Sequence, residues 1–162
     1  MKLHEMKAIA ILIGRRNWLT NLENWQNANK IALNTIEEND GKLTLIEINK
    51  EIPFEVRRIF FIHSVPSVET IRGNHASENT DFFIQAICGT VRLELFDGKK
   101  TEIYQLNNLM YGVYVPRMTW VKMYGFSSET IVQVCASKEY KYCKYINDLK
   151  EYMEQLSAGR RK

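Results

Sequence analysis

The chain has 162 residues, of which 45% are hydrophobic and 25% are charged, the balance of an ordinary soluble globular domain. This composition excludes collagen-like, low-complexity and wholly disordered proteins, and a chain of this length can bury about 70% of its unfolded surface without disulfides or a structural metal. Because Arg160, Arg161 and Lys162 account for the net charge of +3, the rest of the chain is close to neutral, which argues against a nucleic-acid partner.

Residues 1–40 differ from the rest of the chain and are predicted to form a small N-terminal extension. The apolar run at residues 8–13 is too short for a signal sequence or a membrane span. Trp18, Leu22 and Trp25 follow at helical spacing within an Asn-rich segment. We therefore expect a helical or irregular addition to the main domain, no membrane partner and a cytoplasmic location.

From residue 42 onward, short apolar runs typical of strands follow one another with turn residues between them. They occupy residues 42–48, 58–65, 82–88, 91–96, 101–106, 112–115, 120–124 and 130–136. Val91, Leu93 and Leu95 alternate with Arg92 and Glu94 and precede Asp97-Gly98, a strong hairpin signal because glycine accepts a positive φ. Short strands without intervening helices indicate an all-β fold. We predict a cupin-type jelly-roll barrel that spans residues 41–158 together with a C-terminal helix.

That C-terminal helix is predicted to be amphipathic and to precede a basic tail at residues 159–162. Apolar side chains recur at spacings of three and four, at Tyr142, Tyr145, Ile146, Leu149, Met153 and Leu156. Gly159 follows as a stop signal. We expect the helix to run to about Leu156 and to pack its apolar stripe against the barrel.

The densest group of polar residues is Arg72-Gly73-Asn74-His75-Ala76-Ser77, which lies between two apolar strands. A histidine is a base that titrates near neutral pH, and an arginine offers a planar fork that suits a phosphate. Gly73 lets the backbone turn or approach a ligand closely. Two interpretations stay open: residues that face a ligand at the mouth of the barrel, or a polar surface loop that contains a histidine by chance.

A second cluster lies at residues 117–124, where strand alternation places Trp120, Lys122 and Tyr124 on one face. Inside the barrel, Trp120 would offer a stacking surface for a sugar or base, Lys122 a cation for a phosphate, and Tyr124 a phenol that can donate a proton. In the alternative, Trp120 packs against the core and the other two side chains are solvated. Periodicity does not decide between these arrangements.

The sequence predicts neither a bound metal nor a cofactor. The histidines are His4, His63 and His75, and Ser77 stands where an alternating second ligand would lie. The glycines are isolated, which excludes the glycine-rich phosphate loops of kinases and dinucleotide enzymes. The cysteines lack CxxC spacing and are interpreted as reduced thiols, most of them buried: Cys88, Cys135 and Cys143.

Residues 42–155 resemble the sugar-nucleotide 3,4-ketoisomerases, small cupin enzymes that act on dTDP-4-keto-6-deoxyglucose in deoxysugar biosynthesis. The order and spacing of several short motifs carry the resemblance: Ile52-Pro53-Phe54, Arg58-Ile59-Phe60-Phe61, Arg72-Gly73-Asn74-His75-Ala76, Gly112-Val113-Tyr114-Val115, Trp120, Phe126-Ser127-Ser128 and Ala136-Ser137. The resemblance implies a metal-independent homodimer with exchanged strands and a dTDP-linked keto-deoxysugar as the ligand.

By position, the resemblance implies that His75 is the active-site base and that Arg72 binds the substrate. Asn74, Ser77, Trp120, Lys122 and Tyr124 are the further expected substrate-binding residues. The implied reaction removes the proton from sugar C3, passes through an enediol and returns a proton at C4, so two proton-transfer roles are needed.

The chain departs from the family pattern at two places. Members of that family carry a second histidine where this chain has Ser77, and they tend to have tyrosines at the positions of Phe60 and Phe61. Serine is a poor base, and phenylalanine can neither donate nor accept a proton. Two other functions therefore stay open beside the isomerase: a sugar-nucleotide epimerase on the same barrel, with His75 opposed by an acid such as Tyr124, and a catalytically idle nucleotide-sugar-binding cupin.

Overall fold

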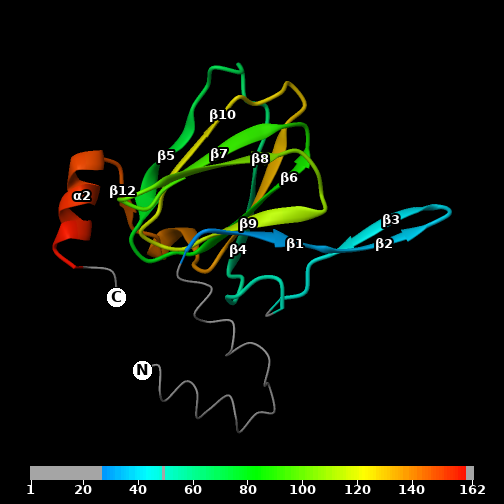
Figure 1. The fold of residues 1–162 in the computed structure, drawn as a ribbon, viewed down its shortest axis with the longest axis horizontal. Coiled ribbons are helices and arrows are strands. Elements are labelled where there is room, and N and C mark those ends of the chain that lie inside the picture. Colours follow the sequence, from blue (N-terminus) through cyan, green and yellow to red (C-terminus); the bar gives the residue numbers. More distant parts are fainter. Residues whose placement is uncertain (1–26, 49, 160–162) are drawn as a thin grey trace, which may run out of the picture.

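The computed structural model describes residues 27–48 and 50–159, and most of the regular structure in this part of the chain consists of antiparallel strands (Figure 1). The predicted helical segment around Trp18, together with His4 and all but Gly159 of the basic tail predicted at residues 159–162, lies outside the described residues. No helix within the described residues is long and apolar enough to cross a membrane.

Two five-stranded sheets face each other, and a separate two-stranded hairpin projects from them (Figure 1). The first sheet has the strand order β1-β9-β6-β11-β4, formed by β1 (Asn29–Ala32), β9 (Tyr111–Val115), β6 (Phe82–Cys88), β11 (Ile131–Ala136) and β4 (Arg58–Ile62). The second has the order β12-β5-β10-β7-β8, formed by β12 (Tyr145–Ile146), β5 (Arg72–Ser77), β10 (Trp120–Tyr124), β7 (Val91–Phe96) and β8 (Thr101–Leu106). The hairpin consists of β2 (Asn34–Glu38) and β3 (Gly41–Leu45). This architecture confirms the predicted all-β barrel.

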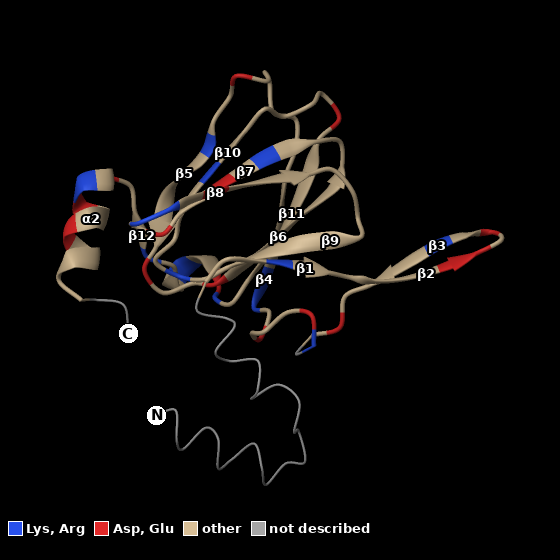
Figure 2. Cartoon of the chain, in the orientation of Figure 1, with Lys and Arg blue, Asp and Glu red and all other residues tan. Residues whose placement is uncertain are grey.

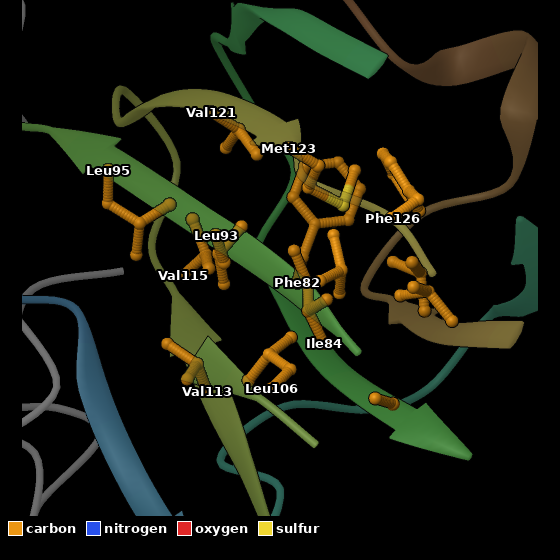
Figure 3. Packing of buried hydrophobic residues seen from close by; sticks show 14 of the residues in the cluster. Phe82, Ile84, Leu93, Leu95, Leu106, Val113, Val115, Val121, Met123 and Phe126 are labelled. Carbon is orange, nitrogen blue, oxygen red and sulfur yellow. The ribbon is translucent and has the colours of Figure 1, made fainter. Parts of the chain in front are cut away.

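The main core lies between the inner faces of the two sheets (Figure 3). Ile84 and Val113 come from the first sheet and meet Leu93, Leu95 and Val121 from the second. Along each strand, every second side chain faces this core, because successive side chains of a strand point to opposite sides of the sheet. Alternation along the strands thus builds the barrel interior.

The outer face of each sheet is also covered in part. Phe83 and Cys135 point outward from the first sheet and pack against Leu33 and Ile52, so β6 is buried on both faces. The second sheet is covered by α2 (Leu149–Ser157), whose Tyr152 is fully buried in a separate cluster that includes Ala76, Met118, Trp120 and Ile146.

The predicted hairpin at Asp97-Gly98 is confirmed as the connection between β7 and β8. The Asp97 carboxylate accepts hydrogen bonds from the backbone N–H groups of Lys99 and Lys100 at 2.7 and 2.9 Å, which closes the turn. Gly98 has φ +92°, the conformation that the Asp-Gly signal anticipates.

The predicted N-terminal boundary is wrong, because the barrel begins before residue 41. Asn29–Ala32 pairs with β9 along its whole length, and Asn34–Glu38 forms the first strand of the projecting hairpin. The Asn-rich and charged composition of this segment hides its strands, since only Ile31 and Leu33 are apolar on the side that meets the first sheet.

The predicted C-terminal helix is shorter than expected. Tyr140–Tyr142 forms a 3-10 turn and Tyr145–Ile146 pairs with β5, so the α-helix begins only after Asp148. The Asp148 carboxylate caps the helix by accepting a 2.8 Å hydrogen bond from the Glu151 N–H. Leu149 and Met153 of the predicted stripe are exposed, whereas Tyr152, outside that stripe, is the buried residue of the helix.

Candidate active site

The site begins with an irregularity in β5 that lies within the predicted polar motif. His75 pairs with Val121 of β10, but the next pair joins Gly73 to Lys122, so Asn74 is the extra residue of a β-bulge. Gly73 and Asn74 both have positive φ, +78° and +59°. A Cβ at Gly73 would lie 2.9 Å from the Val121 carbonyl oxygen, so this position requires glycine.

The bulge determines which way the polar side chains point. In a regular strand, Arg72 and His75 would face opposite sides of the sheet. The extra residue instead leaves Arg72 opposite Met123 and His75 opposite Val121, and both partners belong to the inner core. The sequence thus brings an arginine and a histidine to the inner face of one strand.

His75 is half-buried beside the barrel core. Its ring meets the ring of Tyr145 edge to face, with centroids 4.7 Å apart and an interplanar angle of 67°. Burial lowers the pKa of His75 below its ordinary value of 6.5, and a hydrogen bond with the backbone of Gly73 opposes that shift only in part. His75 is therefore a neutral imidazole at neutral pH, the form that can accept a proton.

Tyr145 links His75 to the opposite sheet. β12 is an edge strand of the second sheet and β4 is an edge strand of the first. We call the place where these two edges meet, at Arg58 and Tyr145, the seam. Across this seam, Arg58 Nη2 donates a 3.4 Å hydrogen bond to Tyr145 Oη, and the guanidinium lies 4.8 Å above the ring of Phe60. Arg58 Nε and Nη1 are buried without a hydrogen-bond partner among the described residues. Two strong donors at the seam are thus unused.

Ser77 lies on the same strand face as His75, but its hydroxyl is already engaged. Ser77 Oγ donates to the Lys144 carbonyl at 3.3 Å and accepts from the Thr80 N–H at 3.1 Å. The side chain is buried and holds together the turn that follows β5. The structure therefore gives Ser77 a local structural contact and leaves its predicted contact with a substrate as a prediction.

Trp120, Lys122 and Tyr124 are not brought to His75, and of the two arrangements left open by the sequence the structure has the one outside the barrel, so their contacts with a substrate stay predictions. Trp120 is opposite Ala76 in the pairing of β10 with β5, and both pack under α2 on the outer face. Lys122 forms a 3.7 Å ion pair with Glu94 and lies over the Tyr124 ring on that outer side. Strand periodicity shows which residues share a face but does not show which face is inside.

Arg72 and Asn74 are exposed at the open end of the β5 bulge. His75 and Arg72 are therefore the predicted residues that the structure places on one inner face.

Sequence reasoning did not single out Arg58 or Tyr145 as site residues. Their contact spans 87 positions of the chain, and the spacing of Tyr145 matched a helix rather than a strand. Within the described residues, no group of three or more His, Cys, Asp or Glu side chains is arranged to hold a metal ion.

Comparisons with known proteins agree with this barrel. The model of the family "FdtA: WxcM-like, C-terminal" matches residues 26–157. The chain belongs to this family. A curated relative, the TDP-4-oxo-6-deoxy-alpha-D-glucose-3,4-oxoisomerase of Aneurinibacillus thermoaerophilus, is 31% identical over 130 residues, which cover 78% of this chain and 93% of that protein.

Solved structures of 3,4-ketoisomerases are similar to this chain over most of their length. The TDP-fucose-3,4-ketoisomerase of Campylobacter jejuni is 33% identical with a TM-score of 0.73, and the match covers 79% of this chain and 94% of that one. The sugar 3,4-ketoisomerase of Thermoanaerobacterium thermosaccharolyticum, solved in complex with TDP, is 26% identical with a TM-score of 0.76, over 82% and 96% of the two chains.

Within the FdtA family barrel, the two phenylalanines noted in the sequence have different environments. Phe60 points inward, packs against the main core and lies under the Arg58 guanidinium. Phe61 points outward and is exposed. Only the Phe60 position therefore faces the seam that holds Tyr145.

Proposed function

We propose that the chain is a 3,4-ketoisomerase of a TDP-linked 4-keto-6-deoxyhexose in deoxysugar biosynthesis. Family membership and the similarity to a TDP-4-oxo-6-deoxyglucose 3,4-oxoisomerase support the reaction class. The observation that carries the proposal is the position of His75: half-buried beside the core, with a pKa lowered by burial and with Arg72 on the same inner face. A base held neutral in the barrel is what proton abstraction next to a carbonyl requires.

The chemistry follows from these groups. His75 removes the proton from C3 of the 4-keto sugar, the enediol forms, and His75 returns a proton to C4. Use of one base at both carbons requires that they present the same face to the imidazole. Arg72 and Asn74, exposed at the bulge, are the groups we assign to the nucleotide diphosphate, because the arginine fork suits two phosphate oxygens.

The test is product analysis by carbon NMR of TDP-4-keto-6-deoxyglucose after incubation with the protein. The proposal predicts that the ketone signal moves from C4 to C3. A ketone that stays at C4 while C3 or C5 exchanges with solvent would identify an epimerase. Binding without exchange or migration would identify an idle nucleotide-sugar-binding barrel, and either result contradicts the isomerase.

We also propose that the protein is a homodimer, joined through the β2–β3 hairpin and the outer side of β4. Ile36 and Leu43 are opposite each other on the hairpin and are both exposed, and Ile59 and Phe61 are exposed on the edge strand β4. Charges of both signs also lie on the hairpin, where Lys42 pairs with Glu37 at 2.9 Å (Figure 2). A two-stranded hairpin is marginal alone in water, so a second copy that covers its apolar pair would stabilise it.

A cytoplasmic location is part of the same proposal. The cysteines Cys88, Cys135 and Cys143 are all free. Unpaired thiols agree with a reducing compartment.

A further inference from the structure

Tyr145 stands at a position from which it can exchange protons with a molecule held against His75. Its strand, β12, pairs with β5 so that Tyr145 is opposite Ser77, one step along the same face from His75. The two rings are in edge-to-face contact, with centroids 4.7 Å apart. The phenol hydroxyl extends from this contact across the seam to Arg58, at 3.4 Å. The His75 imidazole, the Tyr145 phenol and the Arg58 guanidinium, a base, an acid and a cation, therefore lie next to one another in that order.

Other polar side chains near this hydroxyl are engaged elsewhere. Ser77 Oγ donates to the Lys144 carbonyl and accepts from the Thr80 N–H. The Cys143 thiol donates to the Glu139 carbonyl at 3.4 Å, and its sulfur is in hydrogen-bond contact with the Tyr145 hydroxyl. Phe60, below Arg58, has no polar atom. The Tyr145 hydroxyl accepts from Arg58, and its own proton points toward the sulfur of Cys143, a weak acceptor that a substrate oxygen can replace.

Arg58 is placed to stabilise negative charge at this point. Its Nε and Nη1 atoms are buried and find no hydrogen-bond partner in the described part of the chain. Its guanidinium lies over the rings of Phe60 and Tyr140, at 4.8 and 5.3 Å from their centroids, and these contacts favour its position. Donors that are buried, oriented and unused cost stability unless a ligand or a transient charge engages them.

We propose, on the basis of the ketoisomerase function above, that Tyr145 is the second catalytic residue and moves the proton between the two sugar oxygens, while Arg58 is a positioning residue that stabilises its phenolate. In the first half, His75 takes the proton from C3, the C–H electron pair forms the C3–C4 double bond, and the C4 carbonyl oxygen takes the Tyr145 proton. In the second half, the C3 hydroxyl gives its proton to the Tyr145 phenolate as the C3 carbonyl forms, and the double-bond pair takes the His75 proton at C4. No oxidant, reductant or co-reactant is needed.

The electrostatics of the seam suit both halves of this cycle. Burial raises the pKa of Tyr145 above its ordinary value of 10.0, and the hydrogen bond and charge of Arg58 oppose that rise. The phenol therefore keeps its proton at neutral pH and is ready to donate it. The nearby guanidinium lowers the free energy of the phenolate that exists only between the two halves.

The test compares two rates in deuterated buffer, solvent exchange at C3 and migration of the ketone, for the wild type and Tyr145→Phe. The variant keeps the ring that contacts His75 and loses only the hydroxyl. Because Arg58 can still hold the charge of an enediolate, we expect exchange at C3 to persist while migration falls by about 10²-fold or more, the usual contribution of a general acid. The ratio of exchange to migration therefore rises.

Tyr142→Phe is the matched control, because Tyr142 is exposed on the neighbouring turn and should leave both rates unchanged. Unchanged migration in Tyr145→Phe overturns the assignment, and so does an equal fall of both rates, which a merely structural role would produce. If the wild type shows neither exchange nor migration, the proposed function itself fails, and the assignment fails with it.

A second variant keeps the assignment testable if circular dichroism shows that Tyr145→Phe does not fold. Arg58→Gln leaves the Tyr145 ring in place and removes the charge that stabilises its phenolate. We expect migration to fall by about tenfold or more, as when one donor to a developing anion is removed. Migration at the wild-type rate in Arg58→Gln would overturn the role of this pair.

Discussion

Burial of the His75 side chain determines how activity depends on pH. Its pKa is lowered from 6.5, so the imidazole is neutral above that value and becomes protonated only as the pH falls through the lowered pKa. Because the neutral form is the base, we expect kcat/KM to be flat from neutral pH up to the raised pKa of Tyr145 and to decline on the acid side only below about pH 6.5. A pH profile of kcat/KM measures the acid-side decline. An acid-side decline with its midpoint above pH 6.5 would show that another group controls the reaction.

The bulge that orients His75 depends on Gly73. In Gly73→Ala the new Cβ meets the Val121 carbonyl oxygen at 2.9 Å in a backbone with φ +78°. We expect a loss of about 2 kcal/mol or more in the free energy of unfolding, read from urea titration. Gly159→Ala is the control, since φ is +75° there but no atom lies within 4 Å of the Cβ, so only the conformational cost of about 1 kcal/mol should appear. Equal losses would mean that the close contact has no effect.

Part of the site was predictable from the residues alone. His75 and Arg72 were found because their chemistry and their place between two apolar strands suggested a site, and the structure puts both on the inner face. Arg58 and Tyr145 were missed because their contact is made only when the edges of two sheets meet. No local pattern reports a contact between residues so distant in sequence.

Among the elements, α2 shows how one buried hydroxyl fixes a helix to the sheet. The Tyr152 hydroxyl lies 2.9 Å from the carbonyl oxygens of both Phe96 and Met118. We expect Tyr152→Phe to lower the free energy of unfolding by about 1–2 kcal/mol, because buried carbonyls lose a donor. Thermal or urea unfolding measures the loss. Tyr142→Phe, at an exposed position, should change stability by less than about 0.5 kcal/mol, and an equal effect in both variants would contradict the role of this hydroxyl.

The strands that sequence reasoning predicted well are those with an apolar face. The bounds of β6, β7, β8 and β10 agree with the predicted runs. Each of these strands carries apolar residues, alternating or continuous, that pack into a core. β1, β2, β5 and β12 were missed, since they are short, polar or irregular and are held by pairing with neighbours. The same pairing explains the C-terminal error: Tyr145 and Ile146 have helical spacing but join β5.

For the whole molecule, the exposed apolar residues on one side predict the oligomeric state. We expect the wild type to sediment as a dimer and the variant Leu43→Lys, which places a charge in the apolar pair of the hairpin, to sediment as a monomer. Ile103→Lys is the matched control, because Ile103 is similarly exposed but lies on β8, in the other sheet. A monomeric wild type, or a dimer that tolerates Leu43→Lys, would contradict the proposed interface.

The all-β barrel was predictable from the density of short apolar runs and the Asp97-Gly98 turn, but its assembly from two sheets whose edges meet at the site was not.

The central claim is that His75 at this seam is the base of a keto migration. The most direct measurement is proton NMR of TDP-4-keto-6-deoxyglucose with the wild type and with His75→Asn. We predict conversion to the 3-keto sugar by the wild type and a rate at least about 10²-fold lower in the folded variant. Conversion by His75→Asn at the wild-type rate would contradict the claim.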